Sequence, residues 1–487
     1  MFKRIALVLA FFVLAMGGAR ADTVLQRVAD GINVGEIKTL QFTGNGMMFE
    51  FGQHATPIGP LPRFYLKSLT RVIDFNSGAM RDEMVRAQGE DPARGGGAGQ
   101  PIVGEQRQIQ LVHGDFAWNE AGKDMLPRIW EATYRQHQIW VTPQGFVRAA
   151  LANEAATKSQ TVDGRKMNVI SFTIKGKMKA DAYVNDENVI ERIESWYGNP
   201  VAGDTKVDTR FGGYRDFAGI KFPSKIVQYQ DGNPVLDLDI TAVRVNLPVN
   251  IQTPENVRTN PAPVKVEKAA DGVWYITGGS HHSVLVEMKD YLIVIEGPQG
   301  DERSAAVIAE AKKTVPGKPI RYLVNTHHHF DHSSGVRGFA AEGATIVTHE
   351  INRAFFERAA ANTRNFSPDR LAKSGKKPVF QAMGDNMVLT DGARSVELYQ
   401  IVGNPHHQGL VMAYLRKEKI LVEADAYTPG PAGAEPPKAP HPFSVNLEAQ
   451  VRRLNIEVDT ILPLHGRMVP YSELLAAIGK KPAPAKK

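Results

Sequence analysis

A proline-rich segment near the middle of the chain divides it into two parts with different hydrophobic patterns. Residues 247–263 read LPVNIQTPENVRTNPAP, with four prolines, several Asn and Thr and few apolar side chains. Segments of this composition are typical of linkers. The chain has 487 residues, and domains usually hold about 100–200. We therefore predict an N-terminal domain over 22–250, a linker over 251–264 and a C-terminal domain over 265–478.

The part before the linker has the pattern of an antiparallel sheet. Apolar and polar residues alternate in several short segments, as expected for half-buried strands; these are 168–174, 180–186, 189–198, 225–230 and 235–246. Asp231-Gly232 separates the last two and is typical of a hairpin turn. The glycine-rich stretch 89–101 is interpreted as a flexible insertion, because no strand-to-helix Gly-x-Gly context surrounds it. This part is predicted to be β-rich.

After the linker, predicted strands and helices interleave. The strands are expected at 273–278, 283–288, 291–298, 320–326, 345–349, 396–402, 411–415, 419–425 and 458–464, and helices at 301–313 and 446–456. Asp301 is the expected cap of the first helix. The chain as a whole is therefore predicted to be a two-domain α+β protein, in which the second domain mixes helices with strands.

The first 21 residues have the pattern of a secretory signal peptide. Lys3 and Arg4 precede a short apolar run, and Ala19-Arg20-Ala21 fits a cleavage site between small residues. The apolar run of about 12 residues is too short to span a bilayer. We therefore expect cleavage after Ala21 and export to the periplasm or beyond, with no transmembrane span in the mature chain.

The net charge and the absence of cysteine exclude other classes. The chain has a formal charge of +6, but seven of its cations lie in the leader and in a basic tail, 479–487, that we expect to be disordered. The body is thus near −1 and offers no basic surface for nucleic acid. Without Cys, no disulfide and no thiolate ligand can form, and any zinc site must use His, Asp or Glu.

A cluster of metal-binding residue types follows the predicted strands of the second domain. Residues 326–332 read THHHFDH after a predicted strand, and His406, Asp425 and His465 each follow another. Loops at strand ends are where such folds build sites. In a tight loop, His327 and His329 could hold one metal, and Asp331 with His332 a second. A histidine-rich surface loop that binds metal adventitiously is the alternative.

Residues 327–332 match the His-x-His-x-Asp-His motif of the metallo-β-lactamase superfamily, and the later His, Asp and His follow in that family's order. The similarity covers about 265–475, and it implies an αβ/βα sandwich with two facing sheets. It also implies the metal ligands: His327, His329 and His406 for the first ion, Asp331, His332 and His465 for the second, and Asp425 between them. His407 competes with His406, but the family's spacing to Tyr414-Leu415 selects His406.

The superfamily's function supplies a further expectation. Its best-known lactamases have Cys where this chain has Asp425, so the chain more closely resembles binuclear hydrolases such as glyoxalase II-like thioesterases and lactonases. The resemblance implies a zinc-dependent hydrolase in which a hydroxide bridging two Zn²⁺ attacks an ester, lactone, thioester or lactam carbonyl. Asp331 would orient that hydroxide and pass a proton to the leaving group.

Two alternatives remain open. One is an enzyme of the same fold with a single iron, resembling persulfide dioxygenases. The other is a non-enzymatic envelope protein that binds lipid or a partner. For the second, the pattern Phe211-Gly-Gly-Tyr214-Arg-Asp with Gly219 and Pro223 resembles the half-barrel domains of periplasmic lipoprotein carriers, which implies that the N-terminal domain is a half-barrel.

The substrate is expected to be a small molecule positioned by loops. Residues 429–443 contain six prolines and directly follow the Asp425 region, so they are expected to form a wall of the site. Tyr427, His441 and Arg467 are the candidate substrate contacts. His281 and His282, at a predicted turn, are interpreted as loop residues near the mouth of the site and not as ligands.

Overall fold

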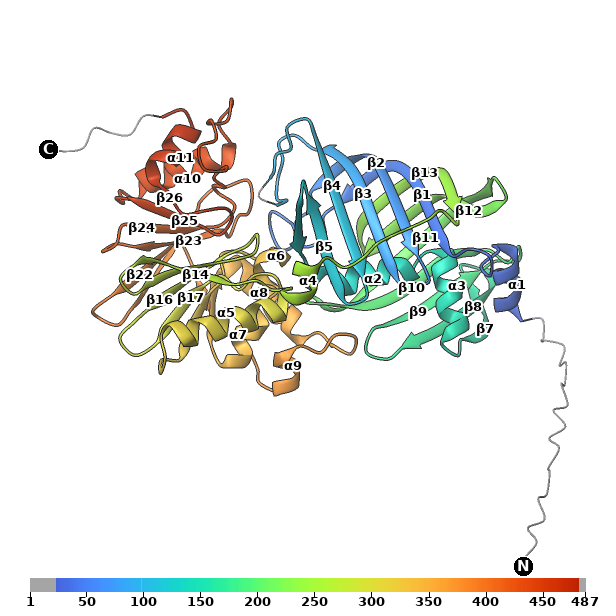
Figure 1. Cartoon of the computed structure of the whole chain (residues 1–487). Coiled ribbons are helices and arrows are strands. Elements are labelled where there is room, and N and C mark those ends of the chain that lie inside the picture. The colour runs from blue at the N-terminus through green and yellow to red at the C-terminus, as the bar shows by residue number, and fades with distance from the viewer. Residues whose placement is uncertain (1–22, 98, 481–487) are drawn as a thin grey trace, which may run out of the picture.

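The computed structural model describes residues 23–97 and 99–480. It shows two domains side by side, joined by a chain segment that crosses between them (Figure 1). The predicted signal peptide, 1–21, lies outside the described residues, as does most of the predicted basic tail. None of the described helices has the length and apolar character needed to cross a bilayer.

The N-terminal domain is built on one sheet of 13 strands, in the order β6-β5-β4-β3-β2-β1-β13-β12-β11-β10-β9-β8-β7. Neighbouring strands along this order pair antiparallel. The strands are β1 (Thr39–Phe49), β2 (Arg63–Asp74), β3 (Ala79–Gln88), β4 (Glu105–His113), β5 (Phe116–Ala121), β6 (Asp124–Pro127), β7 (Ala156–Val162), β8 (Arg165–Ile174), β9 (Met178–Val184), β10 (Ile190–Asn199), β11 (Gly203–Phe217), β12 (Ile220–Gln230) and β13 (Asn233–Val245).

Helices fill the concave side of this sheet. They are α1 (Val24–Gly31), α2 (Ala132–Trp140) and α3 (Pro143–Ala152), and a 3₁₀ turn, η1 (Ile129–Glu131), precedes α2. Helix α2 contacts the neighbouring strands β3 and β4 and also β10, which lies far from them in the strand order. The sheet must therefore curl around α2, as Figure 1 shows. The prediction of a β-rich domain is confirmed, and the three helices that fill it were not predicted.

The hairpin predicted at Asp231-Gly232 joins β12 and β13. Gln230 pairs with Asn233 across it, and the two turn residues have φ of 44° and 82°. Two successive residues with positive φ make the turn whose twist matches that of the flanking strands. Asp tolerates this conformation better than most residues, and Gly adopts it freely.

The C-terminal domain holds two facing sheets with helices outside, the predicted αβ/βα sandwich. One sheet has β14 (Lys265–Ala270), β15 (Val273–Thr277), β16 (Ser283–Glu287), β17 (Leu292–Ile295), β18 (Ile320–Val324), β19 (Thr345–His349) and β20 (Val379–Met383), in chain order. The other has β21 (Asn386–Thr390), β22 (Ser395–Gln400), β23 (Val411–Leu415), β24 (Ile420–Glu423), β25 (Thr460–Pro463) and β26 (Val469–Pro470). Val286 and Ile293 of the first sheet share an apolar cluster with Leu398 and Val422 of the second.

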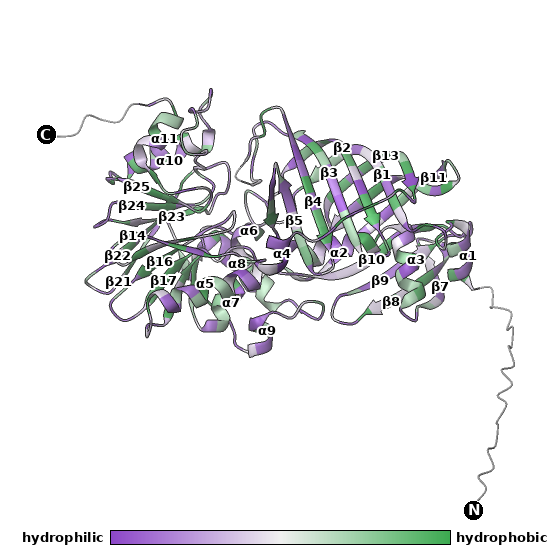
Figure 2. Ribbon diagram, viewed as in Figure 1, coloured by the Kyte–Doolittle hydropathy of each residue, from purple (hydrophilic) through white to green (hydrophobic). Residues whose placement is uncertain are grey.

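Helices cover the outer faces of both sheets. They are α5 (Gly300–Thr314), α6 (Phe330–Ser333), α7 (Val336–Glu342), α8 (Glu350–Ala361), α9 (Arg370–Ser374), α10 (Pro442–Arg453) and α11 (Tyr471–Ala477), and a short α4 (Glu255–Thr259) lies before β14. Apolar side chains of α5 and α7 pack on the first sheet, and those of α10 and α11 on the second. Figure 2 shows the resulting apolar strands of this domain beside the alternating strands of the N-terminal sheet.

Two helix starts differ from the predictions. Helix α5 is preceded by Gln299, which has φ of 57° and no capping side chain. Asp301 is not the cap, because its carboxylate accepts a hydrogen bond from Arg370 Nε at 3.0 Å. Helix α10 begins at Pro442, four residues earlier than predicted, since proline suits the first turn and the His441 side chain accepts from the Phe443 amide at 3.3 Å.

Candidate metal centre

The predicted metal ligands lie in loops that follow strands of the C-terminal domain. His327 follows β18, His406 lies between β22 and β23, Asp425 follows β24 and His465 follows β25. β23 and β24 are buried throughout, and β18 and β25 are buried at the ends that lead into the ligand loops. Buried strands hold the start of each loop firmly, and the loops converge on one edge of the sandwich.

The first group of ligand atoms belongs to His327, His329 and His406. One ligand atom of each lies within 4.8 Å of the others, and the Nε2 atoms of His327 and His406 are 3.1 Å apart. All three side chains are buried. Burial lowers the pKa of His327 well below its ordinary value and that of His329 to about 3. The imidazoles of His327 and His329 are therefore neutral, the form that binds metal.

The second group contains Asp331, His332 and His465, together with His281. The Nε2 atoms of His332 and His465 are 3.0 Å apart. His281 Nε2 lies 3.0 Å from Asp331 Oδ2. Burial disfavours the charged form of Asp331, but the neighbouring His332 and His281 hold the pKa of this carboxyl well below its usual range. The group thus offers one carboxylate and three imidazoles.

Asp425 lies between the two groups. Its Oδ2 is 2.8 Å from His332 Nε2 and 3.3 Å from His406 Nε2, and its Oδ1 is 3.2 Å from His465 Nε2. The residue has φ of 58°, a conformation that Asp tolerates better than most side chains. Burial disfavours ionisation of Asp425, but His406, His332 and His465 hold its pKa well below the ordinary value. The placement suits a bridging carboxylate.

Several buried atoms of the centre have no hydrogen-bond partner among the described residues. They include Nδ1 of His329 and Nδ1 of His406, and the Asp425 carboxylate faces imidazole nitrogens of both groups. A buried carboxylate normally needs hydrogen bonds or a cation. A carboxylate beside several imidazoles is a donor set that suits a divalent cation such as Zn²⁺. The residues present therefore fit one cation in each group, with Asp425 shared.

Hydrogen bonds to the second ring nitrogen orient most of these imidazoles. His327 Nδ1 is 2.9 Å from Thr326 Oγ1, His332 Nδ1 is 3.2 Å from Glu296 Oε2, and His465 Nδ1 is 3.1 Å from the Ser280 carbonyl. In each case Nε2 remains to face the centre. Such partners fix the tautomer and the ring orientation of metal-binding histidines.

The C-terminal domain is similar to known proteins. Residues 276–465 match the family model described as "Metallo-beta-lactamase superfamily". This part of the chain belongs to the metallo-beta-lactamase superfamily. A metallo-beta-lactamase from Pontibacter korlensis is 20% identical over 44% of this chain and 97% of its own, with a TM-score of 0.35.

Two curated relatives match parts of the chain. The 2,4-dinitroanisole O-demethylase subunit alpha of Nocardioides sp. is 25% identical over 33% of this chain and 45% of its own length. The linear primary-alkylsulfatase of Pseudomonas sp. is 36% identical over 12% of this chain and 11% of its own. The chain thus matches less than half the length of either relative.

The structure separates the two adjacent histidines of the superfamily's third motif. His406 contributes to the first group. His407 faces away from it, because its Nε2 is 2.7 Å from His328 Nδ1 and its Nδ1 accepts from the Gly409 amide at 2.9 Å. His328 packs against Phe355 and Phe330 packs against Phe51. Both lie outside the ligand groups.

His281 is placed differently from its prediction. It is not a residue at the mouth of the site: it is buried, its ring centroid is 4.1 Å from that of His465, and it belongs to the second group. His282, by contrast, turns away, with Nε2 2.7 Å from the Gly466 carbonyl. The sequence did not indicate which of these two adjacent histidines faces the centre.

Glu296 is a further residue of the centre that was not predicted from the sequence. It is fully buried at the end of β17 and accepts from Asn325 Nδ2 at 3.0 Å and from Thr326 Oγ1, in addition to its contact with His332. It therefore holds the turn that leads into the motif and orients one of its ligands. An acidic residue at the end of the apolar run YLIVIEGP was the available signal.

The three predicted substrate contacts lie in different surroundings. Tyr427 is buried in the apolar cluster under α10 and α11. Arg467 pairs with Glu473 at 2.6 Å, and its guanidinium donates to the Gly430 carbonyl. His441 Nε2 is 2.5 Å from the carbonyl of Gln100 in the N-terminal domain. Of the three, only His441 lies at the boundary between the domains, and a substrate role for each stays a prediction.

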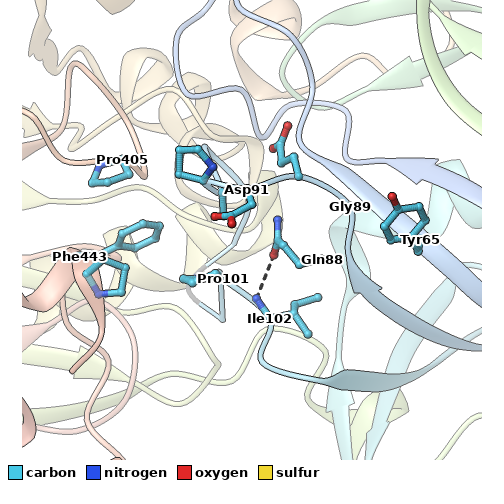
Figure 3. Close-up of a pocket in the computed structure, with 12 residues that line it drawn as sticks. Tyr65, Gln88, Gly89, Asp91, Pro101, Ile102, Pro405 and Phe443 are labelled. Carbon is cyan, nitrogen blue, oxygen red and sulfur yellow. Dashed lines mark hydrogen bonds between the residues drawn. The ribbon is translucent and has the colours of Figure 1, made fainter. Parts of the chain in front are cut away.

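A cavity of about 530 Å³ lies between the two domains near the first ligand group. The glycine-rich stretch 89–101 and its neighbours form one side, and Pro405, Pro442 and Phe443 form the other (Figure 3). Pro405 directly precedes His406, and the Phe443 and His406 rings are 5.6 Å apart. The glycine-rich stretch is therefore a wall of this cavity, and the predicted wall 429–443 contributes its end.

Proposed function

We propose that this protein is a periplasmic hydrolase that uses two Zn²⁺ ions to cleave an ester, lactone, thioester or lactam. The observation that carries the proposal is the placement of Asp425 between two groups of buried ligands, one of three imidazoles and one containing Asp331. A set arranged in this way suits two cations that share a carboxylate. Two ions bound there would lower the pKa of a shared water and polarise the bond to be cleaved.

The side chains of the centre would have two roles in this reaction, metal binding and proton transfer. His327, His329 and His406 would hold the first ion, and Asp331, His332 and His465 the second. Asp331 is the group placed to accept a proton and return it to the leaving group, because its carboxylate is ionised and partly exposed, at 16%. The other ligands are buried, which limits competing water at the centre.

The interdomain cavity is where we propose that the substrate's remote part binds. Its walls include Pro101, Ile102, Pro405 and Phe443, and its described lining residues include Glu90 and Asp91 but no Lys or Arg. Apolar walls with carboxylates favour a substrate whose remote part is apolar or cationic and disfavour an anion there. The alkylsulfatase relative adds sulfate esters to the bonds worth testing.

The first test is elemental analysis of protein purified from the periplasm without added metal. We expect about two zinc ions per chain, together with hydrolysis of at least one acyl or sulfate ester substrate. One iron per chain would favour the dioxygenase alternative, and the absence of tightly bound metal would overturn the proposed centre. N-terminal sequencing of the same sample should find residue 22 first, and an intact Met1 would overturn export by signal cleavage.

A separate experiment tests whether the cavity binds the remote part of the substrate. Ile102→Trp should fill it and lower kcat/KM for long acyl substrates by about 10-fold or more, with a smaller effect on acetyl esters, since a bulky side chain would occupy the space of the acyl chain. Val103→Trp is the matched control, because Val103 is next in the chain and 94% exposed. Equal effects of Ile102→Trp on short and long substrates would contradict this assignment.

A further inference from the structure

We propose that the N-terminal domain is part of the metal centre, because its residues Gln53 and His54 position two ligands of the C-terminal domain. In this arrangement Gln53 fixes Asp331 through its side chain, and His54 fixes His329 through its main chain. The inference rests on the proposed metal centre and assigns a role to the β-rich domain. Both residues are positioning residues that act through the ligands they contact.

The two residues belong to a segment that leaves the sheet after β1 and reaches across to the ligand loops. Two main-chain hydrogen bonds attach it there, and a third attaches a neighbouring loop. The Phe330 amide donates to the Gly52 carbonyl at 3.2 Å, and the Gln408 amide donates to the Ala55 carbonyl at 2.9 Å. The Gly95 amide of the neighbouring glycine-rich loop donates to the Pro405 carbonyl at 3.1 Å. The segment thus lies between the His-x-His-x-Asp-His motif and the His406 loop.

Gln53 provides a direct side-chain contact with a ligand. Its Nε2 donates to Asp331 Oδ1 at 2.7 Å, while Oδ2 of the same carboxylate faces His281 Nε2 at 3.0 Å. The two donors hold opposite oxygens of one carboxylate and so fix its rotation. A carboxylate oxygen has two lone pairs, so an oxygen that accepts from Gln53 can still face a cation.

His54 orients a ligand through its carbonyl. His329 Nε2 donates to the His54 carbonyl oxygen at 2.7 Å, which places the proton on Nε2 and leaves the Nδ1 lone pair free. That Nδ1 is buried and has no hydrogen-bond partner in the part of the chain that the structure describes. The corresponding partners of His327, His332 and His465 come from the C-terminal domain. His329 is therefore the histidine whose tautomer depends on the other domain.

A third contact reaches the second group indirectly. Arg128 of the N-terminal domain donates through Nη1 to Ser280 Oγ at 2.7 Å. The carbonyl of the same serine accepts from His465 Nδ1 at 3.1 Å. The N-terminal domain thus touches or supports ligands in both groups from two separate loops, and the two domains enclose the centre between them.

Gly52 shows how close this approach is. It has φ of +84°, and a Cβ added there would overlap the ring of Phe330, the residue between His329 and Asp331. Both the backbone conformation and the space therefore require glycine. Phe51 adds an edge-to-face contact with Phe330, with ring centroids 5.4 Å apart. Any larger residue at position 52 must push the segment away from the motif.

The decisive experiment compares zinc binding by the full chain and by Gln53 variants. Metal-free protein is titrated with Zn²⁺ against a chelator of known affinity, and bound metal is counted. Gln53→Met keeps most of the side-chain volume but removes the donor, and we expect one of the two ions to bind about 10- to 100-fold more weakly. Gln53→Ala should do the same if the Met variant fails to fold. Ile58→Ala, at a position of the same segment that is 88% exposed, should leave both affinities unchanged.

Cobalt(II) titration adds a readout that is independent of turnover. The visible spectrum of the Co²⁺-loaded protein should change in Gln53→Met and stay unchanged in Ile58→Ala, because only the former alters a ligand's orientation. Gly52→Ala should weaken binding of both ions by at least 10-fold, since it displaces the contacts to Asp331 and His329 together.

The outcomes separate the inference from the proposed function. If the unmodified protein binds no metal, the proposed centre is wrong. If it binds two ions, and Gln53→Met and Gln53→Ala both bind them with unchanged affinity and an unchanged cobalt spectrum, the centre stands and the role of the N-terminal domain is overturned.

Discussion

The two domains bury their strands in different ways and contribute different chemistry. In the N-terminal sheet, burial alternates along a strand such as β11, since one face packs on helices and the other meets solvent. In the C-terminal sandwich, β16, β17, β23 and β24 are buried almost throughout. All the predicted ligands follow strands of the C-terminal sandwich, whereas the first domain supplies loops that contact them.

The comparison teaches that ligand-bearing and ligand-positioning roles are divided between the domains. Buried charges such as Asp425 require a rigid and compensated surrounding, which the sandwich provides between its two layers. The direct contacts from the N-terminal domain to ligands are made by neutral groups, namely an amide side chain and a main-chain carbonyl. Substitutions in the two domains should therefore differ in kind, and the following predictions test that difference.

The largest effect is expected for Asp425→Ala. Its carboxylate faces imidazoles of both groups, so its loss should weaken binding of both ions and lower kcat/KM by at least about 10³-fold, because the charge stabilisation at the centre is lost. Elemental analysis and steady-state kinetics would measure this. Asp163→Asn, in an exposed turn of the N-terminal domain, is the matched control. Retention of both ions in Asp425→Ala would contradict the shared-ligand assignment.

A somewhat smaller effect is expected for Asp331→Asn. If Asp331 transfers the proton, kcat should fall by about 10²-fold or more, with a smaller change in KM. Metal content must be measured on the same sample, because Asp331 is also an expected ligand. An unchanged kcat in a fully loaded variant would exclude the proton-transfer role.

The adjacent histidines 281 and 282 give a sharper comparison within one turn. Both are buried, but only His281 faces Asp331. His281→Ala should weaken binding of one ion by about 10- to 100-fold, while His282→Ala should lower thermal stability without changing either affinity. Chelator competition and calorimetry on both variants would measure this. The same loss of affinity in both would mean that any cavity in this turn disturbs the centre.

The smallest effect concerns the N-terminal domain alone. Burial lowers the pKa of His137 from 6.5 to about 3, and its Nε2 lies 2.9 Å from Ser195 Oγ. The unfolded chain binds a proton at this residue below pH 6.5 and the folded chain does not, so stability is lost as pH falls from 6.5 towards 3. From pH 6.5 to pH 5 this loss is at most about 2 kcal/mol.

His137→Gln should remove that part of the acid sensitivity. Urea unfolding of this variant at pH 7 and pH 5 should show a smaller difference than for the unmodified protein. His113→Gln, at a half-buried histidine of the same domain, is the control. An identical pH dependence before and after substitution at position 137 would show that its burial does not govern acid stability.

Several features of the fold could be predicted because they depend on short stretches of chain. The β12–β13 hairpin follows from Asp231-Gly232, and the strands of the C-terminal domain follow from uninterrupted apolar runs. The start of α5 could not be predicted in this way, since Asp301 has a better partner in Arg370, far along the chain. Helix α2 was not predicted, because its buried residues include the polar side chains Arg135, His137 and Gln138. These side chains interrupt the apolar periodicity by which a buried helix is identified in a sequence.

By itself, the sequence determined the residues able to hold metal, their order and their positions after strands, because a motif of six residues and the periodicity of strands are local properties. Only the tertiary structure decided that His281 faces the centre while His282 does not, and that Glu296, Gln53 and the His54 carbonyl orient ligands. These contacts join segments up to 278 residues apart. Their geometry depends on how two separately patterned domains pack, and no local pattern in the chain encodes that packing.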